Sequence, residues 1–271
     1  MIQYAYGDIH GMYDTFVDLR AAVHSYHQEH YDDAEFNEIL LGDYVDRGMQ
    51  SKKVLEYIIE HDDEFIVLPG NHEELMYDFF ASQTFPDILR YGSFWARNGG
   101  TTTMCSFFDE HEKHPSFEQD NWYDLSQVID WKNHVEQNFP HILEYLRKIR
   151  GVGFLNKVWH IEDRVLFVHA GIHPFLPFKD HEREDLLWGR NKTFLMDECP
   201  DKWIDQKDFD LVVHGHTISS NVAVGPRRIG VDTGAYSTGT LSVAVIEDGN
   251  FVGSLSAHGT PSIYEYKGRK Q

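Results

Sequence analysis

The sequence predicts an α/β fold, because short apolar runs alternate with stretches that carry apolar residues at helical spacing. Three apolar runs near the N-terminus, at residues 2–6, 39–41 and 65–68, have the length of buried strands. Each is followed by a glycine-containing turn and then by a segment with apolar residues three or four positions apart. This order is typical of βαβ units, whose parallel strands end at a common edge of the sheet.

A helix is predicted after each of the three turns. The apolar residues with helical spacing form three sets: Met12, Phe16, Leu19 and Val23; Val54, Leu55, Ile58 and Ile59; Leu75, Met76, Phe79 and Phe80. From about residue 84 to 150 the strand pattern disappears, and residues 141–150 have helical spacing. We therefore expect an α-helical insert at about 84–150 inside a single domain of residues 1–271, because no linker flanks it. The tryptophans of the insert are expected in its core: Trp95, Trp122 and Trp131.

The second half of the chain is predicted to be rich in strands. Strand patterns occupy seven stretches, at residues 153–160, 165–168, 211–213, 222–224, 228–231, 241–246 and 251–255. Turn signals separate two pairs of these strands. Glu162-Asp163 lies between the first two, and Asp248-Gly249 lies between the last two. Asp-Gly is a strong hairpin signal, because both of its residues tolerate positive φ.

The composition limits the classes of function. The chain has 271 residues, with 24 Lys and Arg against 44 Asp and Glu, which gives a formal net charge of −20. This balance argues against nucleic acid as a partner, since phosphate binding needs clustered basic side chains. No apolar stretch approaches the ~20 residues of a membrane span, and no signal-peptide pattern opens the sequence. With two cysteines and hence no disulfide framework, a cytoplasmic protein is expected.

Residues of the types that bind metal ions stand directly after predicted strands. They lie in five motifs: Gly7-Asp8-Ile9-His10-Gly11, Gly42-Asp43-Tyr44-Val45-Asp46-Arg47-Gly48, Gly70-Asn71-His72-Glu73, Val168-His169-Ala170-Gly171 and His214-Gly215-His216-Thr217. Open α/β sheets build their sites at the carboxyl ends of strands, so we expect these loops to meet. One such motif is most often a turn, but five in this order are hard to explain as turns alone.

The candidate metal ligands are Asp8, His10, Asp43, Asn71, His169 and His216. Six ligands are too many for one ion that keeps room for water and substrate. We therefore predict two divalent ions with one bridging carboxylate, as in two-metal phosphate-transfer sites. Imidazole and carboxylate without cysteine favour Mn²⁺, with Fe or Zn as alternatives, over Ca²⁺ or a structural zinc.

Other histidines are interpreted as ordinary surface residues. His24, His27 and His30 have i, i+3, i+6 spacing on one helical stretch, which could imitate a metal site. A solvated helix face is the simpler interpretation of these three. His111, His114 and His173 are also interpreted as surface residues.

The five motifs resemble those of the calcineurin-like metallophosphoesterases, and the second and third resemble the PPP-type serine/threonine protein phosphatases. Finer matches point to the bacterial and phage branch: Trp95 with Asn98-Gly99-Gly100, Leu187-Trp188-Gly189-Arg190, and Val231-Asp232-Thr233-Gly234-Ala235. The resemblance runs from about residue 4 to 246. It implies two mixed β-sheets packed as a sandwich and flanked by helices, in a four-layer αββα arrangement with the helical insert.

The resemblance also implies how the metal ligands divide. The first ion would be held by Asp8 and His10, the bridge made by Asp43, and the second ion held by Asn71, His169 and His216. His214 is a second candidate in the last motif, and His216 is preferred because the family pattern places the ligand in Gly-His-Thr.

The catalytic roles are likewise implied by the resemblance. Arg47 and Arg190 would bind phosphate oxygens, and Asn71 would also face the substrate. His72 would be the general acid, with Asp46 holding its imidazole. These roles suit the chemistry, since guanidinium binds phosphate bidentately and imidazole titrates near neutrality. Tyr236 receives no role.

The implied function is a dimetal-dependent phosphomonoester hydrolase, first of all a serine/threonine protein phosphatase, acting by direct attack of a metal-bridging hydroxide. Its substrate would be a phosphorylated protein, a peptide or a small phosphomonoester. One alternative is a dinucleoside-tetraphosphate pyrophosphohydrolase, which shares the first three motifs. A non-catalytic phosphate-binding protein is the other alternative, and the complete set of ligands together with His72 argues against it.

Overall fold

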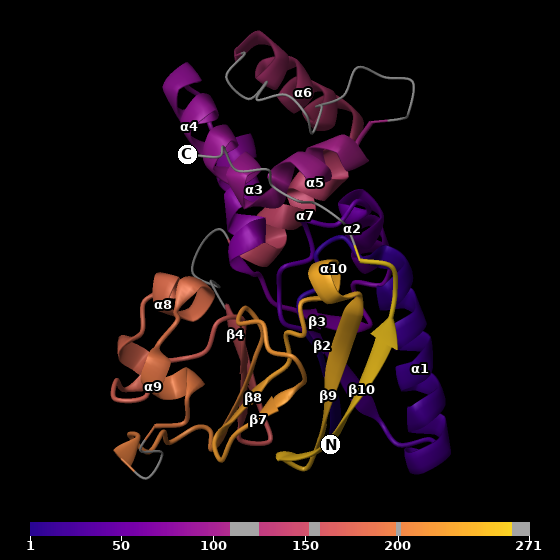
Figure 1. Ribbon diagram of the computed structural model, residues 1–271, viewed down its shortest axis with the longest axis vertical. Helices are drawn as coiled ribbons and strands as arrows, with labels where there is room; N and C mark the ends of the chain where they lie inside the picture. The colour runs from indigo at the N-terminus through magenta and orange to yellow at the C-terminus, as the bar shows by residue number, and fades with distance from the viewer. Residues whose placement is uncertain (109–124, 152–157, 199–201, 262–271) are drawn as a thin grey trace.

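The structure is a computed structural model that describes residues 1–108, 125–151, 158–198 and 202–261 (Figure 1). Within these ranges the strands form two five-stranded sheets. The helices of the insert stand together at one end of the molecule, above the two sheets in Figure 1. None of the described helices is long and apolar enough to cross a bilayer.

The first sheet contains the three strands that the N-terminal apolar runs predict. Its order is β10 (Asn250–His258), β9 (Thr240–Glu247), β1 (Ile2–Tyr6), β2 (Phe36–Leu40) and β3 (Phe65–Val67). β1, β2 and β3 are parallel, whereas β9 runs antiparallel to both β1 and β10. The three predicted helices follow these strands in turn, as α1 (Tyr13–Tyr31), α2 (Ser51–Glu60) and α3 (Asn71–Ala81).

The second sheet is also mixed. Its order is β4 (Trp159–Glu162), β5 (Val165–Val168), β6 (Leu211–His214), β8 (Arg228–Gly230) and β7 (Ala223–Val224). β5, β6 and β8 are parallel, with β4 and β7 antiparallel at the two edges. Among the described residues, the second half of the chain contains four short helices: η3 (Phe178–Asp180), α8 (Arg183–Trp188), α9 (Lys192–Leu195) and α10 (Ala235–Thr238).

Alternating side chains place the two sheets face to face. On β1, Tyr4 and Tyr6 belong to the core under the N-terminal helices, whereas Ala5 belongs to a core shared with the second sheet. On β5, Phe167 faces that shared core and Leu166 faces a third core that includes residues of α8 and α9. Because successive side chains of a strand point to opposite faces, each sheet has one face on its partner and one under helices. This confirms the four-layer αββα fold.

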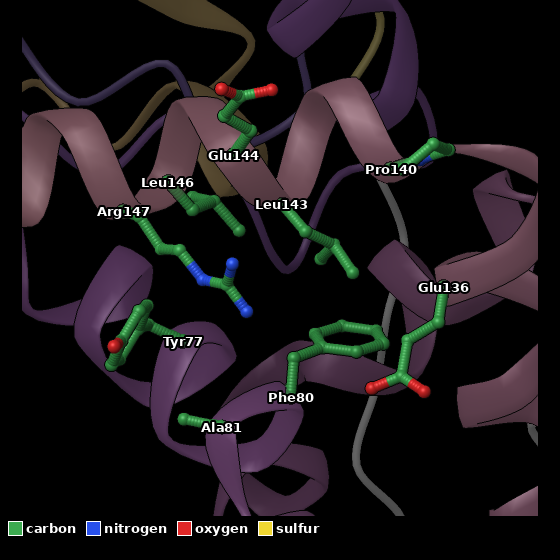
Figure 2. A pocket seen from close by; sticks show the side chains of 9 residues that line it. All are labelled: Tyr77, Phe80, Ala81, Glu136, Pro140, Leu143, Glu144, Leu146 and Arg147. Carbon is green, nitrogen blue, oxygen red and sulfur yellow. The ribbon is translucent and has the colours of Figure 1, made fainter.

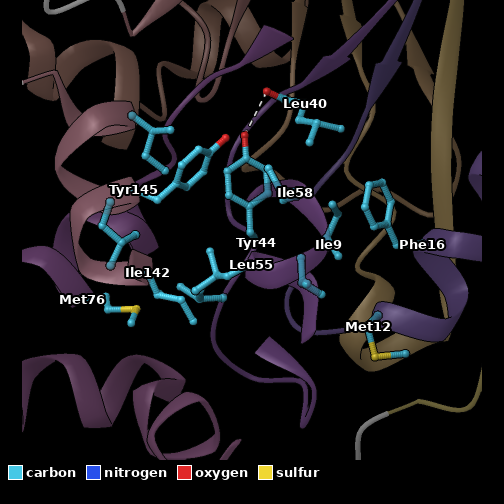
Figure 3. Close-up of a cluster of buried hydrophobic side chains, with 14 of the residues drawn as sticks. Ile9, Met12, Phe16, Leu40, Tyr44, Leu55, Ile58, Met76, Ile142 and Tyr145 are labelled. Carbon is cyan, nitrogen blue, oxygen red and sulfur yellow. Dashed lines mark hydrogen bonds between the residues drawn. The ribbon is translucent and has the colours of Figure 1, made fainter. Parts of the chain in front are cut away.

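The described residues of the insert form helices joined by short turns. It contains α4 (Phe85–Trp95), the π-helical turn η1 (Ala96–Gly100), α5 (Thr101–Ser106), α6 (Leu125–Asn138) and α7 (Pro140–Arg150). Trp95 and Trp131 are buried as predicted, and Trp122 lies outside the described residues. Figure 3 shows Ile142 and Tyr145 of α7 packed beside Leu55 of α2, so the core of the insert continues into the α/β core. The division into one domain of 1–271 stays a prediction.

Two turn predictions have different outcomes. Asp248-Gly249 joins β9 to β10 with φ values of 49° and 79°, which confirms the predicted hairpin. The turn between β4 and β5 is Asp163-Arg164, with φ values of 47° and 63°, and not Glu162-Asp163. Glu162 pairs with Val165 as the last residue of β4, so the prediction was one residue early. Residues 153–157 of the predicted strand lie outside the described residues.

The interpretation of the surface histidines is wrong for His27. This side chain is 4 % exposed, and its Nδ1 lies 3.0 Å from the hydroxyl of Tyr4 while its Nε2 lies 2.8 Å from the carbonyl oxygen of Ala34. It is therefore a hydrogen-bonded core residue between α1 and β1. His24, His30 and His173 are exposed as predicted, whereas His111 and His114 lie outside the described residues.

Candidate active site

The six predicted metal ligands meet at one rim of the sandwich, and all are buried. Three of them follow β1 and β2 of the first sheet, one begins α3, and two follow β5 and β6 of the second sheet: Asp8, His10, Asp43, Asn71, His169 and His216. The parallel strands of both sheets end at this rim, which is why loops distant in sequence converge there. The backbone N–H of His216 donates to Asp8 at 3.1 Å, which joins the two sheets directly.

Left-handed backbone conformations concentrate at this rim. Among the described residues, ten non-glycine residues have positive φ, and five of them are candidate site residues: His10, Asp43, Asp46, Arg47 and His216. Such conformations cost free energy in non-glycine residues and persist where the surroundings enforce them. Here the N–H groups of Ile9 and His10 both donate to the carbonyl oxygen of Asp43, at 3.1 and 2.8 Å.

Asp43 lies between two groups of histidines. Its Oδ2 is 3.6 Å from His10 Nε2 and 3.9 Å from His72 Nε2 on one side. On the other side it is 3.4 Å from His169 Nε2, and His216 belongs to the same group. In the described ranges these two groups, which share Asp43, are the ones with ligand atoms close enough to hold a metal ion.

The imidazoles are oriented for metal binding by their second nitrogen. His10 Nδ1 lies 2.7 Å from the carbonyl oxygen of Val45, and His169 Nδ1 lies 2.9 Å from that of Leu41. A carbonyl oxygen only accepts hydrogen bonds, so each Nδ1 carries the proton. In both rings this directs Nε2 toward Asp43, which is the arrangement that metal-bound histidines adopt. The side chains present therefore fit a pair of divalent cations.

The buried carboxylates also fit a cationic centre. Burial, together with the neighbouring carboxylates of Asp232 and Asp43, raises the pKa of Asp8 well above its usual range. Burial also raises the pKa of Asp232, to about 6. The carboxyl groups of Asp8, Asp43 and Asp232 repel each other when all are ionised in this buried region. A bound cation would offset that repulsion and stabilise the ionised forms.

The histidines differ in their protonation. Burial, assisted by the positive charge of Arg47, lowers the pKa of His10 well below its usual range. Burial also lowers the pKa of His216 to about 3. These two rings are therefore neutral and present a lone pair at neutral pH. Burial would lower the pKa of His169 as well, but the Asp43 carboxylate outweighs it and raises that pKa to about 10.

His72 and Asp46 form a buried pair beside this centre. Asp46 Oδ2 lies 2.6 Å from His72 Nδ1, and the two side chains are 0 and 2 % exposed. His72 is the second residue of α3, and its backbone N–H donates to Asp43 Oδ1 at 3.0 Å. The Nε2 of His72 therefore faces the region of Asp43, with its ring held from the other side by Asp46.

One arginine stands beside each histidine group. Arg47 Nη1 lies 2.7 Å from His10 Nε2, and Arg190 Nε lies 3.1 Å from His216 Nε2. Their guanidinium groups thus approach the centre from the first and the second sheet. The guanidinium of Arg47 also lies 4.8 Å from the ring centroid of Tyr236, a residue to which the sequence assigned no role.

Glu73 is a site residue that sequence reasoning missed. Its buried carboxylate accepts hydrogen bonds of 2.8 Å from the backbone N–H groups of Asp43, Tyr44 and Gly70, which ties the loop after β2 to the start of α3. Burial raises its pKa to about 7. The signal was available, because a glutamate three residues after a helix N-cap is typical of a capping box.

His214 does not belong to either metal group. It is buried at the end of β6, and its Nδ1 lies 2.9 Å from the carbonyl oxygen of Gly215. Burial lowers its pKa to about 4. The geometry therefore favours His216 over His214 as the histidine of this motif.

A pocket of about 250 Å³ lies outside this rim (Figure 2). It is formed between α3 and the helices of the insert, with lining residues that include Tyr77, Phe80, Leu143 and Arg147. None of the predicted site residues lines it.

The chain is similar to several known proteins, of which three are described first. The chain is 24 % identical over 244 residues to serine/threonine-protein phosphatase 2 of Salmonella typhimurium, covering 87 % of this chain and 88 % of that protein. It is 32 % identical over 110 residues to a zinc-dependent endopolyphosphatase of Saccharomyces cerevisiae, covering 38 % of this chain and 28 % of that longer protein. The crystal structure of a protein provisionally assigned as a diadenosine tetraphosphatase has a TM-score of 0.52 at 18 % identity, covering 96 % of this chain and 95 % of that one.

That structural likeness shows a shared fold. The family model for calcineurin-like phosphoesterases matches residues 4–220, a range that includes all six candidate ligands, both arginines and the His72–Asp46 pair. On this match, the chain belongs to the calcineurin-like phosphoesterase family.

Proposed function

We propose that this protein is a dimetal-dependent phosphomonoester hydrolase of the serine/threonine protein phosphatase type. One observation carries the proposal. Asp43 is shared by two groups that can each hold a cation, one with His10 and His72 and the other with His169 and His216. The buried Asp46 carboxylate contacts His72 of the first group. The Salmonella phosphatase, which matches most of this chain, supports the choice of substrate class.

Binding of the phosphoryl group is assigned to the two arginines and to the start of α3. Arg47 and Arg190 flank the centre, and guanidinium groups bind phosphate oxygens through paired hydrogen bonds. Asn71 begins α3, so the positive end of the helix dipole lies at the same place. Together these groups hold the phosphoryl group with its oxygens directed at the centre.

Two divalent ions, with Mn²⁺ preferred, would be bound at this centre. Asp8 and His10 would hold the first ion, Asn71, His169 and His216 would hold the second, and Asp43 would contact both. When bound, the ions supply Lewis-acid charge and activate water. His72 would donate the Nε2 proton to the leaving oxygen as the phosphorus–oxygen bond breaks. Asp46 would hold the ring through Nδ1 during this transfer. The attack on phosphorus is direct, so no phosphorylated side chain forms.

A side-by-side assay with added Mn²⁺ tests the proposal. The substrates are a phosphoserine peptide, a phosphotyrosine peptide and a dinucleoside tetraphosphate. We expect the phosphopeptides to be cleaved, because the candidate metal ligands and the two arginines are suited to bind a phosphoryl group and not a nucleoside. If the dinucleoside tetraphosphate turns over at least ~100-fold faster in kcat/KM, a gap of ~2.7 kcal/mol in transition-state binding, the pyrophosphohydrolase is correct instead.

A further inference from the structure

We propose that Trp95 and Thr103 of the helical insert are positioning residues for catalysis, which hold the Asp46 carboxylate behind His72. This inference rests on the proposed function. It adds a task for the insert, which the roles above leave without one.

Side chains of the insert form hydrogen bonds with Asp46. Thr103 Oγ1 lies 2.7 Å from Asp46 Oδ1, and Trp95 Nε1 lies 2.9 and 3.0 Å from the two carboxylate oxygens. The backbone N–H of Asp46 donates back to the same Thr103 oxygen at 2.7 Å. Thr103 therefore contacts the carboxylate and the backbone of Asp46 at once, and its hydroxyl can donate to one while accepting from the other.

These contacts decide the orientation of the carboxylate. Asp46 is fully buried, so its carboxylate is surrounded by protein groups and not by bulk water. His72 uses one oxygen, at 2.6 Å from its Nδ1. Thr103 donates to the other oxygen, Oδ1, and the indole N–H of Trp95 lies within hydrogen-bond distance of both oxygens, which leaves the carboxylate one orientation. Because the Asp46 carboxylate is fixed, it also fixes the orientation of the His72 imidazole, from whose Nδ1–H it accepts a hydrogen bond.

The fold of the insert serves this contact. Trp95 ends α4 and Thr103 lies in α5, and η1 between them bends at Gly99, whose φ is 104°. A Cβ on Gly100 would stand 2.5 Å from the ring of Trp95, so glycine is needed there for the indole to reach Asp46. The carbonyl oxygen of Gly99 accepts from the N–H of Arg47 at 3.2 Å, so the same bend also contacts the phosphate-binding loop.

The consequence concerns proton donation and not metal binding. Trp95 and Thr103 do not belong to the two metal groups. Their loss should let Asp46 and the His72 ring move, which slows the reaction of substrates that need a proton on the leaving oxygen. Substrates with an acidic leaving group need that proton least and should be affected least.

The experiment compares phenyl phosphate, whose leaving group is poor, with p-nitrophenyl phosphate in the Mn²⁺-loaded enzyme. The variants are Thr103→Val, which removes the hydroxyl at constant shape, Thr103→Ser, which restores it, and Trp95→Phe. Thr102→Val is the matched control, because Thr102 is a buried neighbour whose hydroxyl bonds to Gly99 and not to Asp46. Metal content and thermal unfolding are measured for each variant.

We expect Thr103→Val and Trp95→Phe to lower kcat for phenyl phosphate by ~10-fold or more, with KM nearly unchanged, and kcat for p-nitrophenyl phosphate by less than ~3-fold. Thr103→Ser should recover most of the loss, and Thr102→Val should keep the wild-type ratio of the two rates. Equal losses on both substrates, or an unchanged ratio in both Thr103→Val and Trp95→Phe, would overturn the inference. A wild-type enzyme that cleaves neither ester shows that the proposed function itself is wrong, and the inference falls with it.

Discussion

The imidazole of His72 and the carboxylate of Asp46 form a buried contact of 2.6 Å between the start of α3 and the loop after β2. Because Asp46 accepts from Nδ1, the Nε2 of His72 is the nitrogen that faces Asp43. The proposed function assigns two different tasks to this centre. Asp43, which both candidate metal groups share, would bridge the ions, and His72 would transfer a proton.

The substitution His72→Asn tests this division of tasks. We expect kcat to fall by ~10²–10⁴, which is the usual contribution of general acid catalysis. The loss should be smaller for p-nitrophenyl phosphate, whose leaving group needs little protonation. Metal content, measured by elemental analysis, should stay at the wild-type level. A His72→Asn protein that no longer binds metal would identify His72 as a ligand and refute its role as the acid.

Chelation of the metal tests the dependence on cations. Protein stripped by a chelator should lose phosphatase activity, because the bound cations supply the Lewis-acid charge and the activated water of the proposed reaction. Added Mn²⁺ should restore activity more than added Ca²⁺, which prefers sites of oxygen ligands. Steady-state rates on p-nitrophenyl phosphate are sufficient for this comparison. Full activity after exhaustive chelation would disprove the mechanism.

Most strands and helices of the fold were predictable because they depend on local alternation. Apolar runs, turns and helical spacing recur in the first half of the chain, and the candidate ligands stand within a few residues of the strands that precede them. The hydrogen bonds of Asp46 are different in kind. Trp95 and Thr103 lie 49 and 57 residues from Asp46, and no local pattern indicates that a bend in the insert brings them back.

His27 shows the same limit in another place. Its spacing from His24 and His30 is what the sequence reveals, but its environment is set by Tyr4, which lies 23 residues away on β1. A histidine on a helix becomes a core residue when the neighbouring strand offers a hydroxyl partner. That partner is a property of the tertiary structure. The four-layer arrangement itself was taken from the family resemblance, because periodicity predicts strands and helices but not how two sheets face each other.

Arg190 offers a test of phosphate binding. Arg190→Ala should raise KM and lower kcat together, because a guanidinium bound to phosphate acts in both the ground state and the transition state. We expect kcat/KM to fall by ~10–100-fold, in line with ~1.5–3 kcal/mol for a hydrogen bond to a charged group. The matched control is Arg164→Ala, since Arg164 is an exposed arginine that pairs with Asp210. Similar values of kcat and KM for the two variants would show that Arg190 does not bind the phosphate of the substrate.

The buried ion pair of Arg20 and Glu38 predicts how stability depends on pH. Arg20 Nη2 lies 3.0 Å from Glu38 Oε2, and both side chains are less than 10 % exposed. Burial alone would raise the pKa of Glu38, but hydrogen bonds from His24 and Arg20 lower it below its ordinary value. A carboxyl group with a depressed pKa in the folded state stabilises the protein above its unfolded pKa of ~4.3, and this contribution is lost as the pH falls through the folded value.

Glu38→Gln should therefore lower the free energy of unfolding by roughly 3 kcal/mol at pH 7. Below about pH 4, this loss of free energy should become smaller as the pH is lowered. Glu64→Gln is the control, because Glu64 contacts the same arginine from a position that is 46 % exposed. Glu64→Gln should lower the free energy of unfolding by at most ~1 kcal/mol. Denaturant unfolding at several pH values gives both numbers. Equal effects of the two substitutions at pH 7 would contradict the assignment of Glu38 as the dominant partner.

The most direct test of the account is anomalous diffraction from crystals grown with Mn²⁺. We expect two anomalous peaks ~3.5–4 Å apart at the rim of the sandwich, with the Asp43 carboxylate contacting both ions. Asp8 and His10 should lie at the first peak, and Asn71, His169 and His216 should lie at the second. A single peak, or two peaks with Asp43 in contact with neither, would contradict the dimetal centre on which the proposed function depends.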